Sequence, residues 1–443
     1  MAQPRDRVVD KLQALVRIPT VSDRDPDRVD AAVFDRLLDE LRAQFPRLHE
    51  SLELTRVGTH GLLFRWAGTG DERPVVLMAH LDVVPVDESA PWQHPPFGGE
   101  IHGGSIWGRG TLDDKGCVVA ICEAVELLLE AGATPAQDVW LSFGCDEEVS
   151  GTAAVAAVEE LRTRGVTPWF VLDEGGAIAH QAFPGVEPPL GVIGVTEKGT
   201  TSVELVAEGR GGHASTPARN GPTARIARAI LRIEKSPFPA SAPEPTLELL
   251  RRLAPYLPAP VRPVARNADR ITPLVTKALL AAGPEAAAMT RTTVAATTLS
   301  GSPALNVIAS SARAGLNIRI MVGDTVAGVL DHLRRAIRDD DIRIEVVEQG
   351  EPSPVSPMDE AFRLLEQTIL SVFPDAVPTP YVMMAATDSR HFTQISERVY
   401  RFAPFRMTKA QREAIHSYDE HLGIRDLIDG VAWYRTLIER LPR

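Results

Sequence analysis

The chain has 443 residues, 44% of them hydrophobic, which is long enough for two domains and apolar enough for a sizeable core. Its net charge of −12 at pH 7 disfavours nucleic acid and anionic membranes as partners. No apolar run approaches the roughly 18 residues that a membrane span needs, and the N-terminal segment fits an amphipathic helix rather than a signal peptide. Cys117, Cys122 and Cys145 form no CxxC pair, so we expect buried thiols and a cytoplasmic location.

The first half of the chain alternates between strand and helix patterns. Short apolar runs at 74–79, 139–144 and 168–172 predict buried strands, and the Ala-, Val-, Leu- and Glu-rich segments 117–131 and 151–164 predict helices. Alternation of this kind is typical of a mostly parallel sheet with helices on both faces.

After residue 197 the pattern changes to the order β-α-β-β-α-β, which is the ferredoxin-like unit. The six predicted elements are the strand 200–208, the helix 223–234, the strands 292–299 and 312–321, the helix 326–338 and the strand 342–347. Residues 236–290, with ten prolines and many alanines, interrupt this unit as an insertion. We therefore predict an α/β domain formed by 1–196 and 352–443, and a smaller α+β domain formed by 197–351.

Metal-type side chains follow the predicted strands. His80 and Asp82 come directly after the strand 74–79. Either they form a hydrogen-bonded pair at the surface, or His80 is a zinc ligand whose ring is oriented by the Asp82 carboxylate. The loop 108–116 is rich in glycine and precedes a helix, but it lacks the Gly-Lys-Ser/Thr of a phosphate-binding loop. Its two carboxylates would repel a phosphate, so a cation site fits better.

Three further places carry the same types of residue. Glu147 and Glu148 follow the strand 139–144, Asp173 ends the strand 168–172, and His416 lies in a late loop. Taken one at a time, each has an ordinary structural explanation. Glu147 and Glu148 fit a helix cap, Asp173 fits an acidic turn, and His416 fits a surface histidine. Together they supply histidines and carboxylates at successive strand ends, which is a ligand set suited to zinc.

The chain resembles the two-zinc peptidases and amidohydrolases, a family that includes aminoacylase, succinyl-diaminopimelate desuccinylase, glutamate carboxypeptidase and carboxypeptidase S. The matching stretches include MAHLDVVP (78–85), PWQHPPFGGEIHGGSIWGRGTLDDKG (91–116), FGCDEEVSGT (143–152), VLDEGG (171–176), GHASTP (212–217) and IHSYDEHLG (415–423). VLDEGG and TDSRH (387–391) are most similar to the branch of carboxypeptidase S and the N-acyl-amino-acid hydrolases.

The resemblance implies a role for each residue of the metal site. Asp113 would bridge two zinc ions, one completed by His80 and Asp173 and the other by Glu148 and His416. Manganese or cobalt are alternatives to zinc in such a site. Glu147 would be the general base that takes a proton from a metal-bridging water, and Asp82 would orient His80.

The resemblance also implies that the smaller domain is a lid that pairs two subunits. His213 would reach the partner's active site and stabilise the oxyanion, while Asn306 and Arg319 would bind the substrate's terminal carboxylate. The implied activity is hydrolysis of an amide or peptide bond next to an amino-acid carboxylate, of carboxypeptidase or dipeptidase type. The alternatives are an aminoacylase-type N-acyl-amino-acid amidohydrolase and a catalytically silent metal-binding homologue.

Overall fold

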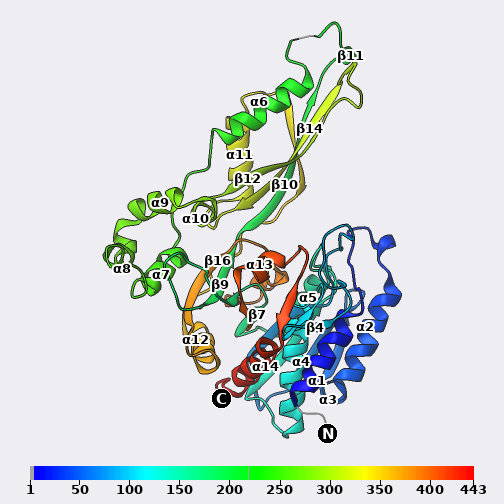
Figure 1. Cartoon of the computed structure of the whole chain (residues 1–443), viewed down its shortest axis with the longest axis vertical. Coiled ribbons are helices and arrows are strands. Elements are labelled where there is room, and N and C mark those ends of the chain that lie inside the picture. The colour runs from blue at the N-terminus through cyan, green and yellow to red at the C-terminus, as the bar shows by residue number, and fades with distance from the viewer. Residues whose placement is uncertain (1–3, 218) are drawn as a thin grey trace.

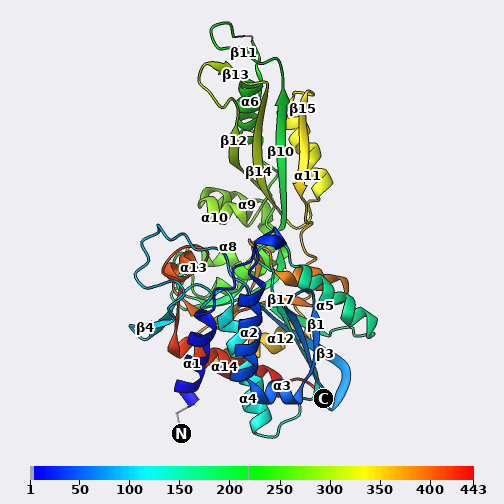
Figure 2. The same ribbon diagram turned by 90° about the vertical axis from the view of Figure 1, so that its right-hand side faces the viewer.

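The computed structural model describes residues 4–217 and 219–443. It has a larger α/β domain, which contains both ends of the described chain, and a smaller elongated domain that projects from it (Figure 1). Turned by 90°, the smaller domain is narrow and stands clear of the larger one along most of its length (Figure 2). None of the helices in the described ranges is both long and apolar enough to cross a membrane.

The larger domain is built on a ten-stranded mixed sheet, in the order β1-β2-β6-β3-β7-β17-β9-β8-β18, with β16 also paired to β9. Pairing is parallel between β6, β3, β7 and β17, between β9 and β16, and between β8 and β18. The strands are β1 (Glu53–Val57), β2 (Gly61–Trp66), β3 (Gly70–His80), β6 (Gln137–Gly144), β7 (Phe170–Asp173), β8 (Ala177–Ala179), β9 (Leu190–Glu197), β16 (Val377–Met383), β17 (Val399–Arg401) and β18 (Arg406–Met407). This is the mostly parallel sheet that the sequence predicted.

Helices cover both faces of this sheet because its central strands are apolar on both sides. Along β3, Val75 and Leu77 pack in the core beneath α1, α4 and α14, whereas Val76 and Met78 pack beneath α5. The helices of this domain are α1 (Pro4–Val16), α2 (Ala31–Gln44), α3 (Pro46–Ser51), α4 (Lys115–Glu130), α5 (Thr152–Thr163), α12 (Glu360–Val372), α13 (Lys409–Ala414) and α14 (Ile424–Glu439). The three cysteines are buried and free, as predicted.

The smaller domain has the strand order β12-β14-β10-β15, with every neighbouring pair antiparallel. Its elements are β10 (Gly199–Glu208), α6 (Pro222–Glu234), β12 (Thr293–Ser300), β14 (Ser311–Ile320), α11 (Val326–Ile337) and β15 (Ile342–Glu348). Alternate residues of β14 are buried against α6 and α11, which lie on one face of the sheet. This order is the ferredoxin-like arrangement predicted from the sequence. A short pair, β11 (Gly212–His213) and β13 (Val307–Ile308), lies at the far end of the domain (Figure 1).

The insertion belongs by its packing to the larger domain, although the sequence analysis assigned it to the smaller one. It folds into α7 (Glu244–Leu253), α8 (Arg262–Arg266), α9 (Thr272–Ala281) and α10 (Pro284–Ala288). Leu253 and Leu257 pack in one core with Val186 and Leu190 of the larger domain, and the half-buried Tyr381 of β16 borders that core. The physical reason is that β16 ends the sheet on this side and leaves apolar side chains that the insertion covers.

A buried ion pair lies where the two domains join. Arg401 Nε is 3.3 Å from Glu197 Oε2, and the two side chains are 0% and 2% exposed. Glu197 also accepts hydrogen bonds from the Thr387 backbone N–H (3.0 Å) and from Ser353 Oγ (3.1 Å). Because Glu197 ends β9 and β10 begins at Gly199, this network fixes the point from which the smaller domain projects.

We expect Glu197→Ala to lower the free energy of unfolding by about 3 kcal/mol, because it leaves the Arg401 guanidinium buried without its partner. Chemical denaturation measures this change. Glu439→Ala is the matched control, since Glu439 pairs with Arg435 at 3.0 Å on a half-exposed helix face and should cost below about 0.5 kcal/mol. Equal effects of the two variants would contradict the assigned role of Glu197.

Candidate metal centre

Three neighbouring parallel strands bring their chemically active residues to one edge of the large sheet. His80 is the last residue of β3 and lies in register with Gly144, the last residue of β6. The turn that carries Glu147 and Glu148 follows Gly144, and Asp173 is the last residue of β7. The carboxyl ends of parallel strands are where open α/β sheets bind ligands, so the fold itself gathers these side chains.

Asp113 lies between two histidines from distant parts of the chain. His80 Nε2 is 2.8 Å from Asp113 Oδ1, and His416 Nε2 is 3.0 Å from Asp113 Oδ2. His416 Nε2 is also 3.0 Å from Glu148 Oε2. The two oxygens of one carboxylate thus face different imidazoles, which is the arrangement a carboxylate needs in order to bridge two ions. Asp114 is wholly buried and accepts a hydrogen bond from the His80 backbone N–H instead.

Asp82 links His80 to the turn of the two glutamates. Its Oδ1 lies 3.4 Å from His80 Nδ1, and its two oxygens accept hydrogen bonds from the backbone N–H groups of Glu147 and Glu148, both at 3.2 Å. Ser22 Oγ donates a further hydrogen bond of 2.7 Å. Burial by itself would raise the pKa of Asp82, but His80 and these hydrogen bonds hold it below its ordinary value. A charged Asp82 therefore fixes both the His80 ring and the glutamate turn.

Asp173 lies in the same buried region but shares no hydrogen bond or ion pair with His80 or Asp113 within the described residues. Its carboxylate accepts hydrogen bonds from the backbone N–H groups of Glu174 and Ser389, both at 2.9 Å. Its role as a ligand stays a prediction.

Several buried carboxylates lie close together in this region. Burial raises the pKa of Asp114, Glu147 and Glu174 well above their ordinary values, and neighbouring carboxylates add to each shift. Burial also raises the pKa of Asp388 to about 8. Neither oxygen of Asp388, nor Glu148 Oε1, has a hydrogen-bond partner although all three atoms are buried. Ionised carboxylates this close together in a buried region repel one another unless cations occupy the space between them.

Several residues that support the site were missed by the sequence analysis. Glu420 is wholly buried and forms an ion pair of 2.7 Å with Arg109. Its carboxylate also accepts hydrogen bonds from the backbone N–H groups of Leu112 (2.8 Å) and Asp113 (3.1 Å), so it holds the loop that presents Asp113. The motif YDEHLG could have pointed to Glu420, because an acidic residue so near His416 is a candidate for holding other site residues in position. Asp388 likewise lies in the motif TDSRH.

The three residues predicted to bind substrate lie in the smaller domain. His213 and Asn306 are exposed beside each other at the far end of that domain, where the Ala214 N–H donates to the Asn306 carbonyl at 3.1 Å. The strand that carries His213, β11, is remote from β7 in the same chain (Figure 1). Arg319 lies at the opposite end of β14, near the larger domain, and its Nη1 donates to Thr200 Oγ1 at 2.8 Å. A single chain therefore does not bring His213 or Asn306 to the metal centre.

Comparison with known proteins identifies the family. The model of "Peptidase family M20/M25/M40" matches residues 76–440. The chain belongs to this family. Members of the M20 family similar to it include a probable carboxypeptidase S-like protein of Dictyostelium discoideum, 35% identical over 91% of this chain and 78% of that protein. The human N-fatty-acyl-amino acid synthase/hydrolase PM20D1 is 34% identical over 99% of this chain and 88% of that protein.

Solved structures of M20 proteins share the fold. A metallo-carboxypeptidase of Sulfolobus solfataricus superposes with a TM-score of 0.72 at 16% identity, over 99% of both chains. Human carnosine dipeptidase 1 gives 0.70 at 16% identity, over 98% of this chain and 96% of the other. A Bacillus subtilis protein described as a dinuclear metal-binding M20 peptidase gives 0.60 at 15% identity, over 98% of both chains. The M20 chain described here is thus a hydrolase of the metallopeptidase type.

The side chains present fit a pair of divalent ions. The set combines imidazole nitrogens with carboxylate oxygens, a mixture that suits zinc and related ions. The contacts His80–Asp113, His416–Asp113 and His416–Glu148 measure 2.8 to 3.0 Å, slightly less than the ~3.3 Å between two ligands of one tetrahedral zinc ion. The unpartnered Glu148 Oε1 provides a further free acceptor.

We expect zinc uptake by the metal-free M20 enzyme at pH 7 to release at least about two protons. Hydrogen bonds to Asp113 and Glu148 raise the pKa of His416 to about 10. Burial opposes a similar shift at His80, yet its hydrogen bonds to Asp113 and Asp82 raise its pKa well above the ordinary value. Both imidazoles therefore carry a proton at pH 7 and must lose it to bind metal, so zinc affinity rises with pH.

Titration calorimetry in buffers of different ionisation enthalpy counts the released protons. The variant His416→Gln should release about one proton fewer, because it removes one of the two titrating rings. Binding heats that are the same in every buffer would contradict this expectation.

Proposed function

We propose that this enzyme hydrolyses the amide bond that joins an acyl or peptidyl group to an amino acid with a free carboxylate. One observation carries the proposal, namely that Asp113 lies between His80 and His416 with one oxygen toward each. The buried edge of the sheet around it combines carboxylates with two imidazoles, a donor set that suits divalent ions able to activate a water for hydrolysis.

In this proposal each side chain has a distinct role. His80, Asp113, Glu148, Asp173 and His416 hold two zinc ions, with manganese or cobalt as alternatives. Ions bound there would polarise the substrate carbonyl and lower the pKa of an attacking water. Glu147 takes the proton from that water and later delivers it to the leaving amine. Its raised pKa suits the first step, because a carboxylate with an ordinary pKa would take up the proton less readily.

Arg319 binds the carboxylate of the substrate together with Asn306 of the partner subunit, because the two residues lie at opposite ends of the smaller domain in one chain. A guanidinium is permanently charged and can donate two parallel hydrogen bonds to a carboxylate. Arg319 has one hydrogen bond to Thr200 and no ion pair in the described residues, so its remaining donors are available. Arg319 lies opposite Thr200 near the start of β10, at the end of the smaller domain that joins the larger one.

The leading candidate for the acyl part is a peptide, which makes the enzyme a carboxypeptidase or dipeptidase. The second candidate is a fatty or acetyl group, which makes it an N-acyl-amino-acid amidohydrolase. The similarity to human PM20D1 over 99% of this chain supports the second candidate, and the similarity to the carboxypeptidase S-like protein supports the first. Both candidate reactions release the same kind of amine product, an amino acid with a free carboxylate.

A panel of substrates with one common leaving residue tests the proposal. Release of phenylalanine is measured from a dipeptide, from N-acetyl-phenylalanine and from N-oleoyl-phenylalanine, each with the zinc-loaded enzyme. We expect the dipeptide to have the highest kcat/KM. Turnover of the acyl substrates alone would replace the peptidase assignment by the second candidate, and turnover of none would contradict the proposed function. The corresponding phenylalanine amides, which lack the carboxylate, should be poor substrates.

We further propose that the enzyme is a homodimer in which His213 completes the site of the other subunit. Exposed apolar side chains near β11 support this, because Leu299, Leu305 and Val307 are 65%, 104% and 46% exposed. Two inactive variants, Glu147→Gln and His213→Ala, should regain part of the wild-type turnover when they are mixed and allowed to exchange subunits. A mixture that stays inactive although hybrid dimers form would contradict the sharing of His213.

A further inference from the structure

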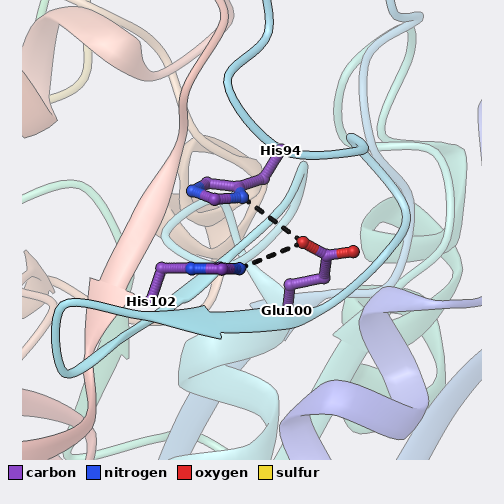
Figure 3. Close-up of side chains that lie close together, drawn as sticks. All are labelled: His94, Glu100 and His102. Carbon is purple, nitrogen blue, oxygen red and sulfur yellow. Dashed lines mark hydrogen bonds and ion pairs between the residues drawn. The ribbon is translucent and has the colours of Figure 1, made fainter.

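A second group of metal-type side chains lies outside the metal centre, in the loop and hairpin that span residues 91–107. His94 Nδ1 is 3.3 Å and His102 Nε2 is 3.2 Å from one oxygen, Glu100 Oε2 (Figure 3). One donor atom from each of the three residues lies within 4.8 Å of the others. We propose that this His94–Glu100–His102 cluster is a third divalent-cation site, which takes an ion of intermediate softness such as Zn²⁺ or Cu²⁺.

The distances within the cluster fit coordination. Two ligands at 2.0–2.1 Å from a tetrahedral zinc ion lie about 3.3 Å apart, and the separations from Glu100 Oε2 are 3.2 and 3.3 Å. Two imidazoles and one carboxylate also leave one position of the tetrahedron open to water or another ligand. The cluster therefore has the donor types and the spacing of an open coordination sphere.

The backbone explains why two of the ligands meet. Glu100 and His102 belong to β4 (Glu100–His102), and residues two apart in a strand point to the same face. Strand β5 (Ser105–Trp107) follows after Gly103 and Gly104, whose φ angles of +59° and +82° fit the tight hairpin turn that needs positive φ at both central positions. The hairpin thus fixes the carboxylate and one imidazole side by side without an ion.

An aromatic stack holds the third ligand in place. The His94 ring stacks on His102 with centroids 3.8 Å apart, and it contacts Trp107 at 4.8 Å. Trp107 in turn stacks on His421 at 4.1 Å and donates a hydrogen bond of 3.1 Å from Nε1 to the His102 carbonyl. The His94 side chain is only 20% exposed. Because these contacts already restrict the ring, less conformational entropy is lost when an ion binds.

The cluster is tied to the loop that carries His416. Strand β19 (His421–Gly423) pairs with β5, with His421 opposite Trp107. Gln93, next to His94, donates from its backbone N–H and its side chain to the carboxylate of Asp419, both at 2.7 Å. An ion in the cluster would therefore join the hairpin and the loop 416–421 into one stiffer unit. Hydrogen exchange in both segments should slow when the third ion binds.

The test measures binding directly and so does not depend on the proposed function. The full-length protein is stripped of metal and titrated with Zn²⁺, with metal content and calorimetry as readouts. We expect three equivalents in the wild type and two in His102→Ala and in His94→Ala, whereas the control His180→Ala keeps three. In the double variant His80→Ala/His416→Ala, Cu²⁺ should still bind at one site and give an electron paramagnetic resonance spectrum with nitrogen ligands.

Adding His102→Ala to that double variant should weaken Cu²⁺ binding by about tenfold or more. Equal Zn²⁺ uptake by the wild type and by His102→Ala would overturn the proposal. So would a third equivalent that survives both His102→Ala and His94→Ala, or that is lost equally in His180→Ala. If the wild type bound the third equivalent but hydrolysed no amide substrate, the third site would stand and only the proposed function would be contradicted.

Discussion

Replacing Glu147 by glutamine is expected to lower kcat by about 10²–10⁴-fold while both catalytic ions stay bound. The amide of glutamine keeps the size of the side chain but cannot accept the proton of the attacking water. The side chain of Glu147 shares no hydrogen bond or ion pair with His80, Asp113 or His416 within the described residues, so metal affinity should change little. Steady-state turnover on the best substrate of the panel, together with metal content, measures both effects.

Glu159→Gln is the matched control for this experiment. Glu159 is an exposed residue of α5 that pairs with Arg162 and has no contact with the site, so this variant should retain wild-type turnover. If Glu147→Gln retained near-full turnover, another group would have to be the base. If it lost activity only by losing metal, Glu147 would instead be a structural support of the ligands.

Replacing Asp113 by alanine should remove both catalytic ions and all measurable turnover. Its two oxygens face His80 and His416, which we propose to bind separate ions, so the substitution would remove a ligand from both. Replacing His416 by alanine is the graded comparison, because it removes a ligand from one site and should cost one equivalent of metal. Metal analysis of the three proteins after identical dialysis distinguishes the expected stoichiometries.

Retention of two catalytic ions by Asp113→Ala would show that Asp113 is not a bridging ligand. Equal losses in Asp113→Ala and His416→Ala would mean that the ions bind cooperatively or that only one is present. These outcomes bear on the metal centre and leave the assignment of the fold and family unaffected.

Much of the fold could be predicted because local periodicity matched the final environment. The alternation of TTSVELVAE (200–208) is that of a strand with one covered face, and β10 runs from Gly199 to Glu208. The continuous apolar runs near Val76 and Leu141 belong to strands that are covered on both sides. A cation site near His80 and the loop 108–116 could be expected from the strand end and from a loop unsuited to phosphate, whereas the choice of Asp113 over Asp114 needed the resemblance to the family.

Other features depend on contacts between distant segments and left no local pattern. The packing of the insertion against β16 and Leu190 requires knowledge of which sheet edge is uncovered. Asp388 approaches the turn of Glu147 and Glu148 only because the chain re-enters the larger domain after residue 351. There η3 (Asp388–Gln394) packs against α5. His94 and His102 are eight positions apart, and their meeting at Glu100 is a consequence of the hairpin and the aromatic stack.

A crystal structure of the zinc-loaded enzyme, with anomalous diffraction data collected at the zinc edge, tests the two-ion centre most directly. We expect two strong peaks on either side of the Asp113 carboxylate, one within bonding distance of His80 and one within bonding distance of Glu148 and His416. The absence of any peak between His80 and His416 would contradict this expectation, as would a single ion that Asp113 does not contact.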